Sequence, residues 1–343
     1  MIYPADCTPL NMFPSSAGLP LGGHSGTKNL DGGSEPQGLH RKTTTSFSKY
    51  DFVKIKVWLK NHYYILSRFL LARMLQSTCM PADAANRISL DVKKVLVEAG
   101  MLEIMQSDLD GAIYASMIRN GYSCLHMDRL RMIVTYHHER IPLVVVVTGS
   151  LCVGKTETAL YLSQALHITS VLQIDHLQTL ILPNNSILRR TAPLMPNGEE
   201  VVKTYRGHCA DLQKSIEPIL NKVVDEGKSM IVEGLLLDPV IWQDWVKKQS
   251  SSAVIVFKVL HIENDEDYRT SLLSWARMQP QSELFPVAPT IAEQVERYHE
   301  TFSYIQSYLR KVTNPDSLSA ANSLHVHEAI LTCMAEKLRE RIL

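Results

Sequence analysis

Residues 143–156 read LVVVVTGSLCVGKT, a run of β-branched residues that leads directly into a glycine-containing loop. A continuous apolar run such as Leu143–Val147 predicts a strand that is buried on both faces of a parallel sheet. The loop Gly149–Thr156 matches G-x-x-x-x-G-K-S/T, in which main-chain N–H groups curl around phosphate oxygens at the start of a helix. We therefore expect a nucleotide-phosphate site between this strand and the helix that follows it.

Two side chains of the loop are expected to contact the nucleotide and its metal, in addition to the main chain. Lys155 is expected to bridge the β- and γ-phosphates, and the Thr156 hydroxyl to take one position on Mg²⁺. A glycine-rich turn that ends in a solvated lysine is the alternative interpretation. The residues expected to bind ATP and its Mg²⁺ are Gly149, Ser150, Leu151, Cys152, Val153, Gly154, Lys155 and Thr156.

Leu151, Cys152 and Val153 are bulkier than the small residues common in such loops. Because the contacts with phosphate come mostly from the main chain, this bulk does not exclude nucleotide binding. Cys152 could act as a redox switch, but we favour its interpretation as an incidental small residue of the loop.

Further strands and helices alternate along the chain after this loop. Runs similar to the first recur at 171–174, 230–232 and 254–260, and helical periods cover 156–166 and 209–223. Strands that alternate with helices predict right-handed βαβ units and an open parallel sheet with helices on both faces. With the phosphate loop, this pattern predicts an α/β fold of the P-loop NTPase, kinase type. We find no internal repeats.

The carboxyl-terminal part of the chain is predicted to be helical. Thr290 and Glu293 form a capping box ahead of an apolar helical pattern, and a final helix is expected over 327–342. We therefore assign residues 140–343 to the kinase-type domain.

The amino-terminal part has a different composition. Residues 1–46 hold 7 of the 16 glycines and 5 of the 16 prolines. Too little apolar surface is available there to offset the entropy of ordering, so we expect 1–47 to be a disordered tail. From about Tyr50 to His138, apolar residues recur at helical spacing, which predicts a small, mainly helical domain over 48–139.

Local signals divide this helical domain. A short strand is predicted at 52–57, and Ser107 with Asp110 resembles an N-capping pair. Gly100 and Gly121 lie where helices are expected to end, because glycine adopts the left-handed conformation that closes a helix.

Charge and composition exclude several classes of partner. The 35 Lys+Arg against 35 Asp+Glu argue against duplex DNA or an anionic membrane. The longest apolar run, 141–147, is far shorter than the roughly 20 residues of a membrane helix. No secretory signal is visible, and 6 dispersed cysteines indicate reduced thiols. We expect a cytoplasmic protein that binds neither nucleic acid nor a membrane; the sequence leaves a homo-oligomer open.

Two acidic residues follow predicted strands. Glu233 ends the strand that begins at Met230, at the sheet edge where such folds bind ligands, and is expected to support Mg²⁺ or the acceptor. Asp175 ends the second strand and could orient or deprotonate an attacking hydroxyl. The alternatives are a surface acid for Glu233 and an N-cap of the next helix for Asp175.

Arginines supply further candidates. Arg269 and Arg277 follow the strand at 254–260 and could close as a lid that spreads transferring charge. Arg189 and Arg190 precede a polar loop and could clamp an anionic acceptor. For both pairs, solvated surface arginines are the alternative.

The chain resembles the 2-phosphoglycerate kinase family, and most closely its eukaryotic branch that contains the plant low-phytic-acid P-loop proteins. The resemblance covers about residues 50 to 340. It depends on the loop Gly149–Thr156, on Gln173-Ile174-Asp175, on the segment Ile231–Pro239 (IVEGLLLDP), and on Ile305–Leu309, which is similar to an I-Q-x-Y-L stretch.

The resemblance implies a role for the amino-terminal domain, and the chain departs from the family's pattern at two positions. It implies that the amino-terminal domain is an ATP-cone, a regulatory nucleotide-binding module, because Leu66–Leu71 to Leu109 is similar to one. ATP would then be sensed through its first strand, with Lys54 and Lys56. Ser303 stands where the family often has arginine, and Tyr268 replaces a usual histidine; these departures concern the acceptor more than ATP.

These observations together predict a kinase that uses ATP and Mg²⁺. Its catalytic residues would be Lys155, Asp175, Glu233, Arg269 and Arg277, and Thr156 and Glu233 would hold the metal. The acceptor would be a small anionic metabolite with a hydroxyl, and the resemblance suggests 2-phosphoglycerate or an inositol phosphate. A non-catalytic ATP-sensing regulator is the main alternative, and a kinase of nucleoside or polynucleotide ends is a third.

Overall fold

The computed structural model describes residues 48–59, 61–139, 141–181, 188–195, 197–278, 290–313 and 317–342, so the tail predicted over 1–47 lies outside the described part. The chain divides into two compact units. The smaller comprises Met1–Ser67 and Leu90–Asn120, and the larger comprises Arg68–Ser89 and Gly121–Leu343. The domain boundaries expected at 47/48 and 139/140 stay predictions of the sequence.

The larger unit contains an open, five-stranded, all-parallel sheet. Its order is β5-β6-β4-β7-β8, so the strand before the loop lies in the centre. The strands are β4 (Leu143–Gly149), β5 (Val171–Gln173), β6 (Met230–Gly234), β7 (Val254–His261) and β8 (Ser317–Ser319). The α/β class and the first four strands were predicted correctly. β8 was not predicted, because three residues with one apolar side chain show no period.

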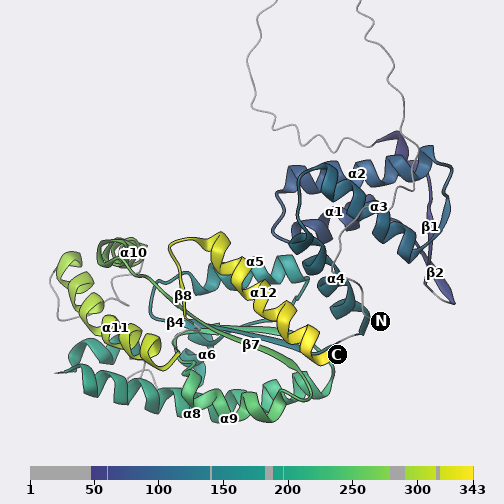
Figure 1. The fold of residues 1–343 in the computed structure, drawn as a ribbon. Helices are drawn as coiled ribbons and strands as arrows, with labels where there is room; N and C mark the ends of the chain where they lie inside the picture. The colour runs from purple at the N-terminus through teal and green to yellow at the C-terminus, as the bar shows by residue number, and fades with distance from the viewer. Residues whose placement is uncertain are drawn as a thin grey trace, which may run out of the picture. The chain divides into compact units, whose positions relative to one another are not determined.

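Helices cover both faces of this sheet (Figure 1). One face carries α5 (Lys155–Leu166) and α12 (Ser323–Ile342); the other carries α8 (Gly198–Asp225), α9 (Pro239–Gln249) and α11 (Ile291–Thr313). Every residue of β4 is buried between these layers, as its β-branched run predicts. The remaining helices of this unit are α1 (Arg68–Gln76), the first part of α2 (Ala82–Glu98), α4 (Cys124–Glu139), α6 (Ile174–Ile181), α7 (Leu188–Thr191), η3 (Ala192–Leu194) and α10 (Asp265–Met278).

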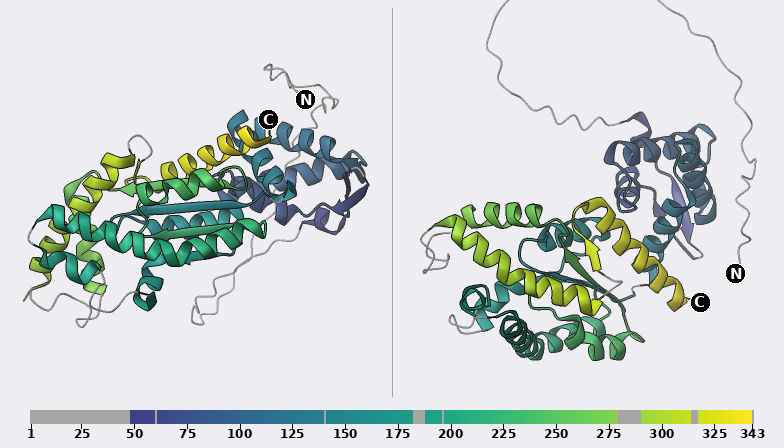
Figure 2. Two further views of the ribbon diagram at one scale, coloured as in Figure 1. Left: turned by 90° about the horizontal axis from the view of Figure 1, so that it is seen from below. Right: turned by 60° about the vertical axis from the view of Figure 1, so that its left-hand side comes forward.

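The carboxyl ends of three strands are aligned. Glu233 of β6 pairs with Gln173 of β5 on one side and with Val147 of β4 on the other. The residues that follow each strand therefore meet at one edge of the sheet, which is where open α/β sheets bind their ligands. The views of Figure 2 show the same layered arrangement from two other directions.

The smaller unit is less purely helical than expected. It holds a three-stranded sheet in the order β2-β1-β3, in which β1 and β2 are antiparallel and β1 and β3 parallel. Its elements are η1 (Lys49–Phe52), β1 (Lys56–Leu59), β2 (His62–Ile65), β3 (Glu103–Met105), the part of α2 from Leu90 onward, and α3 (Gln106–Arg119). The strand predicted at 52–57 is thus β1, which begins later than expected.

Helix ends were predicted with mixed success. Gly100 and Gly121 follow α2 and α3 with φ of 70° and 81°, so both close a helix as expected. The capping pair Ser107–Asp110 was wrong: α3 begins at Gln106, and the Asp108 carboxylate accepts from the Met105 N–H at 3.1 Å.

Further along the chain, Thr290 does cap α11, because its hydroxyl accepts from the Glu293 N–H at 3.2 Å. The final helix starts at Ser323, earlier than the predicted residue 327. Within the described residues, none of the helices combines the length and apolar character that a membrane crossing requires.

Candidate functional site

The loop between β4 and α5 is shaped by its two glycines. Gly149 has φ of 153°, and a Cβ there would overlap the carbonyl oxygen of Leu260 and lie 2.8 Å from Val153 Cγ2. Gly154 precedes α5 with φ of 80°, and a Cβ there would meet open space. The loop is therefore pressed against β7 at its start and open at the amino end of α5, where main-chain N–H groups attract anions.

Ser150 anchors the loop to the two helices that follow β7. Its buried hydroxyl donates to the Phe302 carbonyl oxygen of α11 at 2.9 Å and shares a 2.9 Å hydrogen bond with the Tyr268 hydroxyl of α10. Tyr268, identified in the sequence only as a replacement for histidine, is itself 1% exposed. These contacts link the loop to the segment in which the arginine lid was predicted.

Cys152 adopts an unusual backbone conformation, and the pKa of its thiol is raised. Its φ of 62° is left-handed, although it is not a glycine. Burial raises the pKa of the thiol to about 12, against a smaller opposing effect of Lys155. Because redox-sensing cysteines need a lowered pKa, this environment favours the incidental interpretation of Cys152 over the redox switch.

Lys155 lies inside the curve of the loop. Its side chain is buried, and Nζ donates to the Ser150 carbonyl oxygen at 2.7 Å. The ammonium group therefore lies against the main chain of the loop, and its contact with phosphate stays a prediction. A lysine turned into its own loop differs from the solvated lysine of the alternative interpretation.

Thr156 and Glu233 are joined by a hydrogen bond across the sheet edge. The Thr156 hydroxyl donates to Glu233 Oε1 at 2.9 Å, from the first turn of α5 to the carboxyl end of β6. Glu233 is 2% exposed, so it is not the surface acid of the alternative interpretation. Its pKa is raised, chiefly by burial and then by the neighbouring Asp175, against smaller effects of Lys155 and Thr156.

The second oxygen of Glu233 suits a cation. Oε2 is buried and has no hydrogen-bond partner among the described residues. A buried carboxylate oxygen without a partner is costly, and Mg²⁺ is bound in such folds through one or two protein oxygens together with substrate phosphates. The Thr156 hydroxyl and Glu233 therefore fit Mg²⁺. In the described ranges, no group of three or more His, Cys, Asp or Glu side chains forms a metal site of its own.

Asp175 lies beside this pair. It stands in the first turn of α6, and its Oδ1 accepts from the Leu235 N–H at 2.8 Å. A Cβ on Gly234 would be 2.5 Å from Ile174 Cβ and 3.2 Å from Asp175 Oδ1, so the absence of a side chain at Gly234 permits this approach. The carboxylate thus binds the loop after β6, whereas the N-cap alternative would direct it to its own helix.

This chain is similar to 2-phosphoglycerate kinases. It is 22% identical over 290 residues to the 2-phosphoglycerate kinase of Methanocaldococcus jannaschii, which covers 80% of this chain and 88% of that protein. The enzymes of the same name from Methanococcus maripaludis strain C7 and Methanopyrus kandleri are 21% and 22% identical over 305 residues. These matches cover 82% and 84% of this chain and 91% and 88% of the two relatives. No protein-family model matches the chain.

The predicted lid arginines are not brought to the loop in this structure. Both lie on α10. The Arg269 guanidinium is paired with two acids: Asp265, whose Oδ2 lies 2.9 Å from Arg269 Nε, and Glu296 of α11. Arg277 is exposed in the last turn of α10. Arg269 is adjacent in the chain to Tyr268, so its backbone is close to the loop even though its charge is held elsewhere.

Arg189 and Arg190 lie within the short helix α7, and their side chains lie outside the described residues. The acceptor clamp predicted for them stays a prediction.

A cluster that the sequence analysis missed lies after β6. The buried Asp238 caps α9 by accepting from the Val240 N–H at 2.9 Å. Its Oδ2 also accepts from the Tyr308 hydroxyl at 2.9 Å and lies 3.5 Å from Arg206 Nε of α8. The Asp-Pro pair at the start of a helix is a capping signal that can be read in the sequence. The partners of Asp238, Tyr308 and Arg206, are 70 and 32 positions away, so the sequence around Asp238 does not indicate them.

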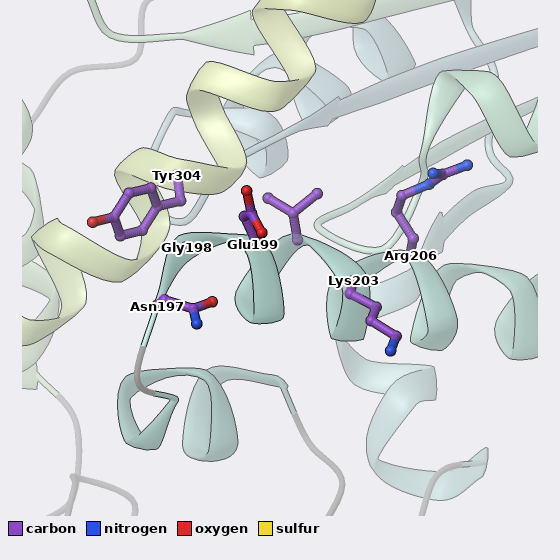
Figure 3. A pocket seen from close by; sticks show the side chains of 7 residues that line it. Asn197, Gly198, Glu199, Lys203, Arg206 and Tyr304 are labelled. Atoms are coloured by element: carbon purple, nitrogen blue, oxygen red, sulfur yellow. The ribbon is translucent and has the colours of Figure 1, made fainter.

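Beside Arg206, the start of α8 and the middle of α11 enclose an open cavity of about 780 Å³ (Figure 3). Most of the residues that line it have polar side chains, but the larger part of the lining surface is formed by their carbon atoms. The lining residues are Asn197, Gly198, Glu199, Val202, Lys203, Arg206 and Tyr304.

Proposed function

We propose that this chain is an ATP- and Mg²⁺-dependent kinase that phosphorylates a hydroxyl of a small anionic metabolite, with 2-phosphoglycerate as the first candidate. The observation that carries the proposal is the hydrogen bond from Thr156 to Glu233 at the mouth of the loop, which leaves a buried carboxylate oxygen without a partner among the residues that the structure describes. The similarity to 2-phosphoglycerate kinases supports the reaction and the acceptor.

The loop residues would bind the nucleotide. The N–H groups at the amino end of α5 would hold phosphate oxygens, and Lys155, released from the Ser150 carbonyl, would neutralise their charge. Thr156 and Glu233 would hold Mg²⁺ through one oxygen each. ATP with its Mg²⁺ supplies the γ-phosphoryl group, polarised for transfer.

Asp175 would receive the proton of the acceptor. The acceptor oxygen forms a bond to the γ-phosphorus while the bond from that phosphorus to the β–γ bridging oxygen breaks, and the hydroxyl proton passes to the Asp175 carboxylate. Oδ1 is oriented by the Leu235 N–H. Oδ2 makes no hydrogen bond to the part of the chain that the structure describes, so it can face a substrate.

The remaining sequence predictions form part of this proposal. Arg269, freed from Asp265 and Glu296, would turn to the transferring phosphoryl group, with Arg277 at the far end of the same helix. In the smaller unit, regulation by a second nucleotide would involve Lys54 and Lys56. Lys56 Nζ lies 2.8 Å from Glu103 Oε1 and 5.4 Å from the Tyr63 ring centroid.

The test is a phosphorylation assay with Asp175→Asn. The full chain, ATP, Mg²⁺ and 2-phosphoglycerate are combined, and the doubly phosphorylated product is measured by mass spectrometry. We expect product with the wild type and a decrease in kcat of about 10²–10⁴-fold in Asp175→Asn. An exposed aspartate elsewhere on the larger unit, Asp211, gives the matched control Asp211→Asn, which should retain the wild-type rate.

Two outcomes would overturn the proposal. A wild-type chain that binds ATP tightly and phosphorylates no small hydroxyl compound supports the ATP-sensing regulator instead. A variant Asp175→Asn with the wild-type rate removes the proton acceptor from the proposed reaction.

A further inference from the structure

One wall of the cavity is α11, a helix that also contacts the candidate nucleotide loop. Residues of α11 line the cavity through Tyr304, and two residues earlier Phe302 of the same helix accepts the hydrogen bond from Ser150 of the loop. The first turns of α8 form its other wall. The last residues of α8 lead into the amino end of β6, which is opposite the end that carries Glu233. The cavity and the loop are thus joined by one rigid element.

Glycine at position 198 lets the two helices meet closely. A Cβ on Gly198 would overlap the ring of Tyr304, which leans over the first turn of α8 in Figure 3. Asn197 caps this turn through a 2.9 Å hydrogen bond from the Glu200 N–H. The Tyr304 ring and the capped first turn of α8 therefore form a rigid wall at one end of the cavity.

Two cationic side chains and one acidic side chain line the rest of the cavity. Lys203 and Arg206 lie on successive turns of α8 and extend in different directions, and Glu199 lies nearer to Tyr304 (Figure 3). The lining therefore has a net positive charge, concentrated away from Glu199. An anionic ligand would place its charge at the Arg206 end.

Arg206 is held by the cluster after β6. The buried Asp238 lies 3.5 Å from its Nε, and the guanidinium carbon lies 5.9 Å from the Tyr308 ring centroid. Because Asp238 faces Nε, the two Nη groups of this half-exposed side chain remain to bind an anion in the bidentate manner that arginine favours. Asp238 and Tyr308 are positioning residues, since they act through Arg206.

The same short segment connects Arg206 to the proposed reaction centre. Leu235 donates to Asp175, and Asp238, three residues later, holds Arg206. The Cα atoms of Leu235 and Asp238 are at most about 11 Å apart, because an extended residue spans no more than about 3.6 Å. The residue that orients Asp175 and the residue that holds Arg206 are therefore close to one another, so a small metabolite bound at Arg206 would lie near this segment.

We infer that this cavity is the acceptor subsite, and that Arg206 binds the phosphate or carboxylate of a small hydroxyl-bearing metabolite whose hydroxyl faces Asp175. The inference rests on the proposed kinase function. It assigns substrate recognition to α8, α11 and the segment after β6, with Lys203 as a secondary cation at the cavity.

The test measures binding of 2-phosphoglycerate to the full chain by calorimetry, without ATP, so that it is independent of phosphoryl transfer. We expect the Kd to rise at least about 10-fold in Arg206→Gln, since hydrogen bonds to charged groups contribute that much or more. Arg206→Lys should recover part of the affinity, and Lys203→Gln should have a smaller effect. Lys214→Gln, on the same helix outside the cavity, is the matched control.

A second measurement separates the subsite from general damage. ATP affinity should be unchanged in Arg206→Gln, and in the kinase assay the KM for the acceptor should rise more than kcat falls. Tyr308→Phe, which keeps Arg206 but removes one partner of Asp238, should raise the acceptor KM by a smaller factor.

The outcomes distinguish this inference from the proposed function. Binding of 2-phosphoglycerate that depends on Arg206, without any turnover, contradicts the kinase and supports the subsite. Turnover with an acceptor Kd and KM that are the same in Arg206→Gln and the wild type contradicts the subsite alone. The subsite is also wrong if neither 2-phosphoglycerate nor an inositol monophosphate binds the wild type at millimolar concentration.

Discussion

The Thr156 hydroxyl donates a 2.9 Å hydrogen bond to Glu233 Oε1, although the two residues are 77 positions apart in the chain. The bond joins the start of α5 to the carboxyl end of β6 at the edge where the central strands of the sheet end in register. It directs one oxygen of a buried carboxylate to the loop and leaves the other without a partner in the described part of the chain.

Glu233→Gln should stabilise the protein in the absence of Mg²⁺ and nucleotide. Burial and Asp175 raise the pKa of Glu233, so the folded chain retains this proton at pH values where the unfolded chain has lost it. The ionised carboxylate therefore costs stability, and the free energy of unfolding falls as the pH rises from the unfolded toward the folded pKa. Thermal unfolding at pH 7 should show a higher Tm for Glu233→Gln than for the wild type.

Glu233→Gln should also lose the thermal stabilisation that bound Mg²⁺ gives the wild type. Added Mg²⁺ and ATP should raise the Tm of the wild type more than that of Glu233→Gln, in which the loop and Lys155 still bind the nucleotide but one metal ligand is missing. Glu300→Gln, an exposed change on α11, controls for the loss of one charge. Equal stabilisation of both proteins by Mg²⁺ and ATP would exclude Glu233 as a metal ligand.

Gly149→Ala should destabilise the protein more than Gly154→Ala. Both glycines have positive φ, which costs an alanine about 1–2 kcal/mol. Only at Gly149 would the new Cβ also overlap the backbone of β7, and overpacking of this kind adds about 1–3 kcal/mol. Urea unfolding of the two variants gives the comparison directly, and a larger loss for Gly154→Ala would contradict the close contact between the loop and Leu260.

Tyr268→Phe should weaken the attachment of the loop to α10. The hydroxyl shares a buried hydrogen bond with Ser150, whose loss should lower the free energy of unfolding by about 1 kcal/mol. Since Ser150 belongs to the loop, the ATP affinity should fall as well. Tyr304→Phe, in which the ring is 43% exposed, is the control for stability and should be close to the wild type in urea.

Cys152 should react slowly with alkylating reagents. Its pKa of about 12 leaves on the order of one thiol in 10⁴ ionised at pH 8, whereas Cys124 is exposed. Treatment of the native protein with iodoacetamide, followed by peptide mass spectrometry, should show modification of Cys124 first. Preferential modification of Cys152 would restore the redox-switch interpretation.

The local part of this site could be predicted from the sequence, and the non-local part could not. The strand Leu143–Val147 and the loop after it carry their own signals, a β-branched run and fixed glycines. β8, and β2 and β3 of the smaller unit, carry no such signal, because three or four residues gain their structure from distant pairing.

The site shows the same division. The positions of Asp175 and Glu233 at strand ends were readable, and the alignment of parallel strands then brings them together. The contact of Tyr268 with Ser150 spans 118 positions, and Arg269 was expected at the phosphates but is held by Asp265 and Glu296. The contact of Tyr268 with Ser150 joins buried side chains that are far apart in the chain, so no local pattern indicates it, whereas the spacing of four between Asp265 and Arg269 is that of a helical ion pair and could have been read.

The central claim is that the loop Gly149–Thr156 binds ATP for transfer to a small hydroxyl compound. The most direct measurement is the transfer of label from γ-labelled ATP to 2-phosphoglycerate by the wild type and by Lys155→Ala at matched concentrations. We predict labelled product with the wild type and at least about a 100-fold lower rate with Lys155→Ala, with circular dichroism showing both proteins folded. Equal rates for the two proteins would contradict the account.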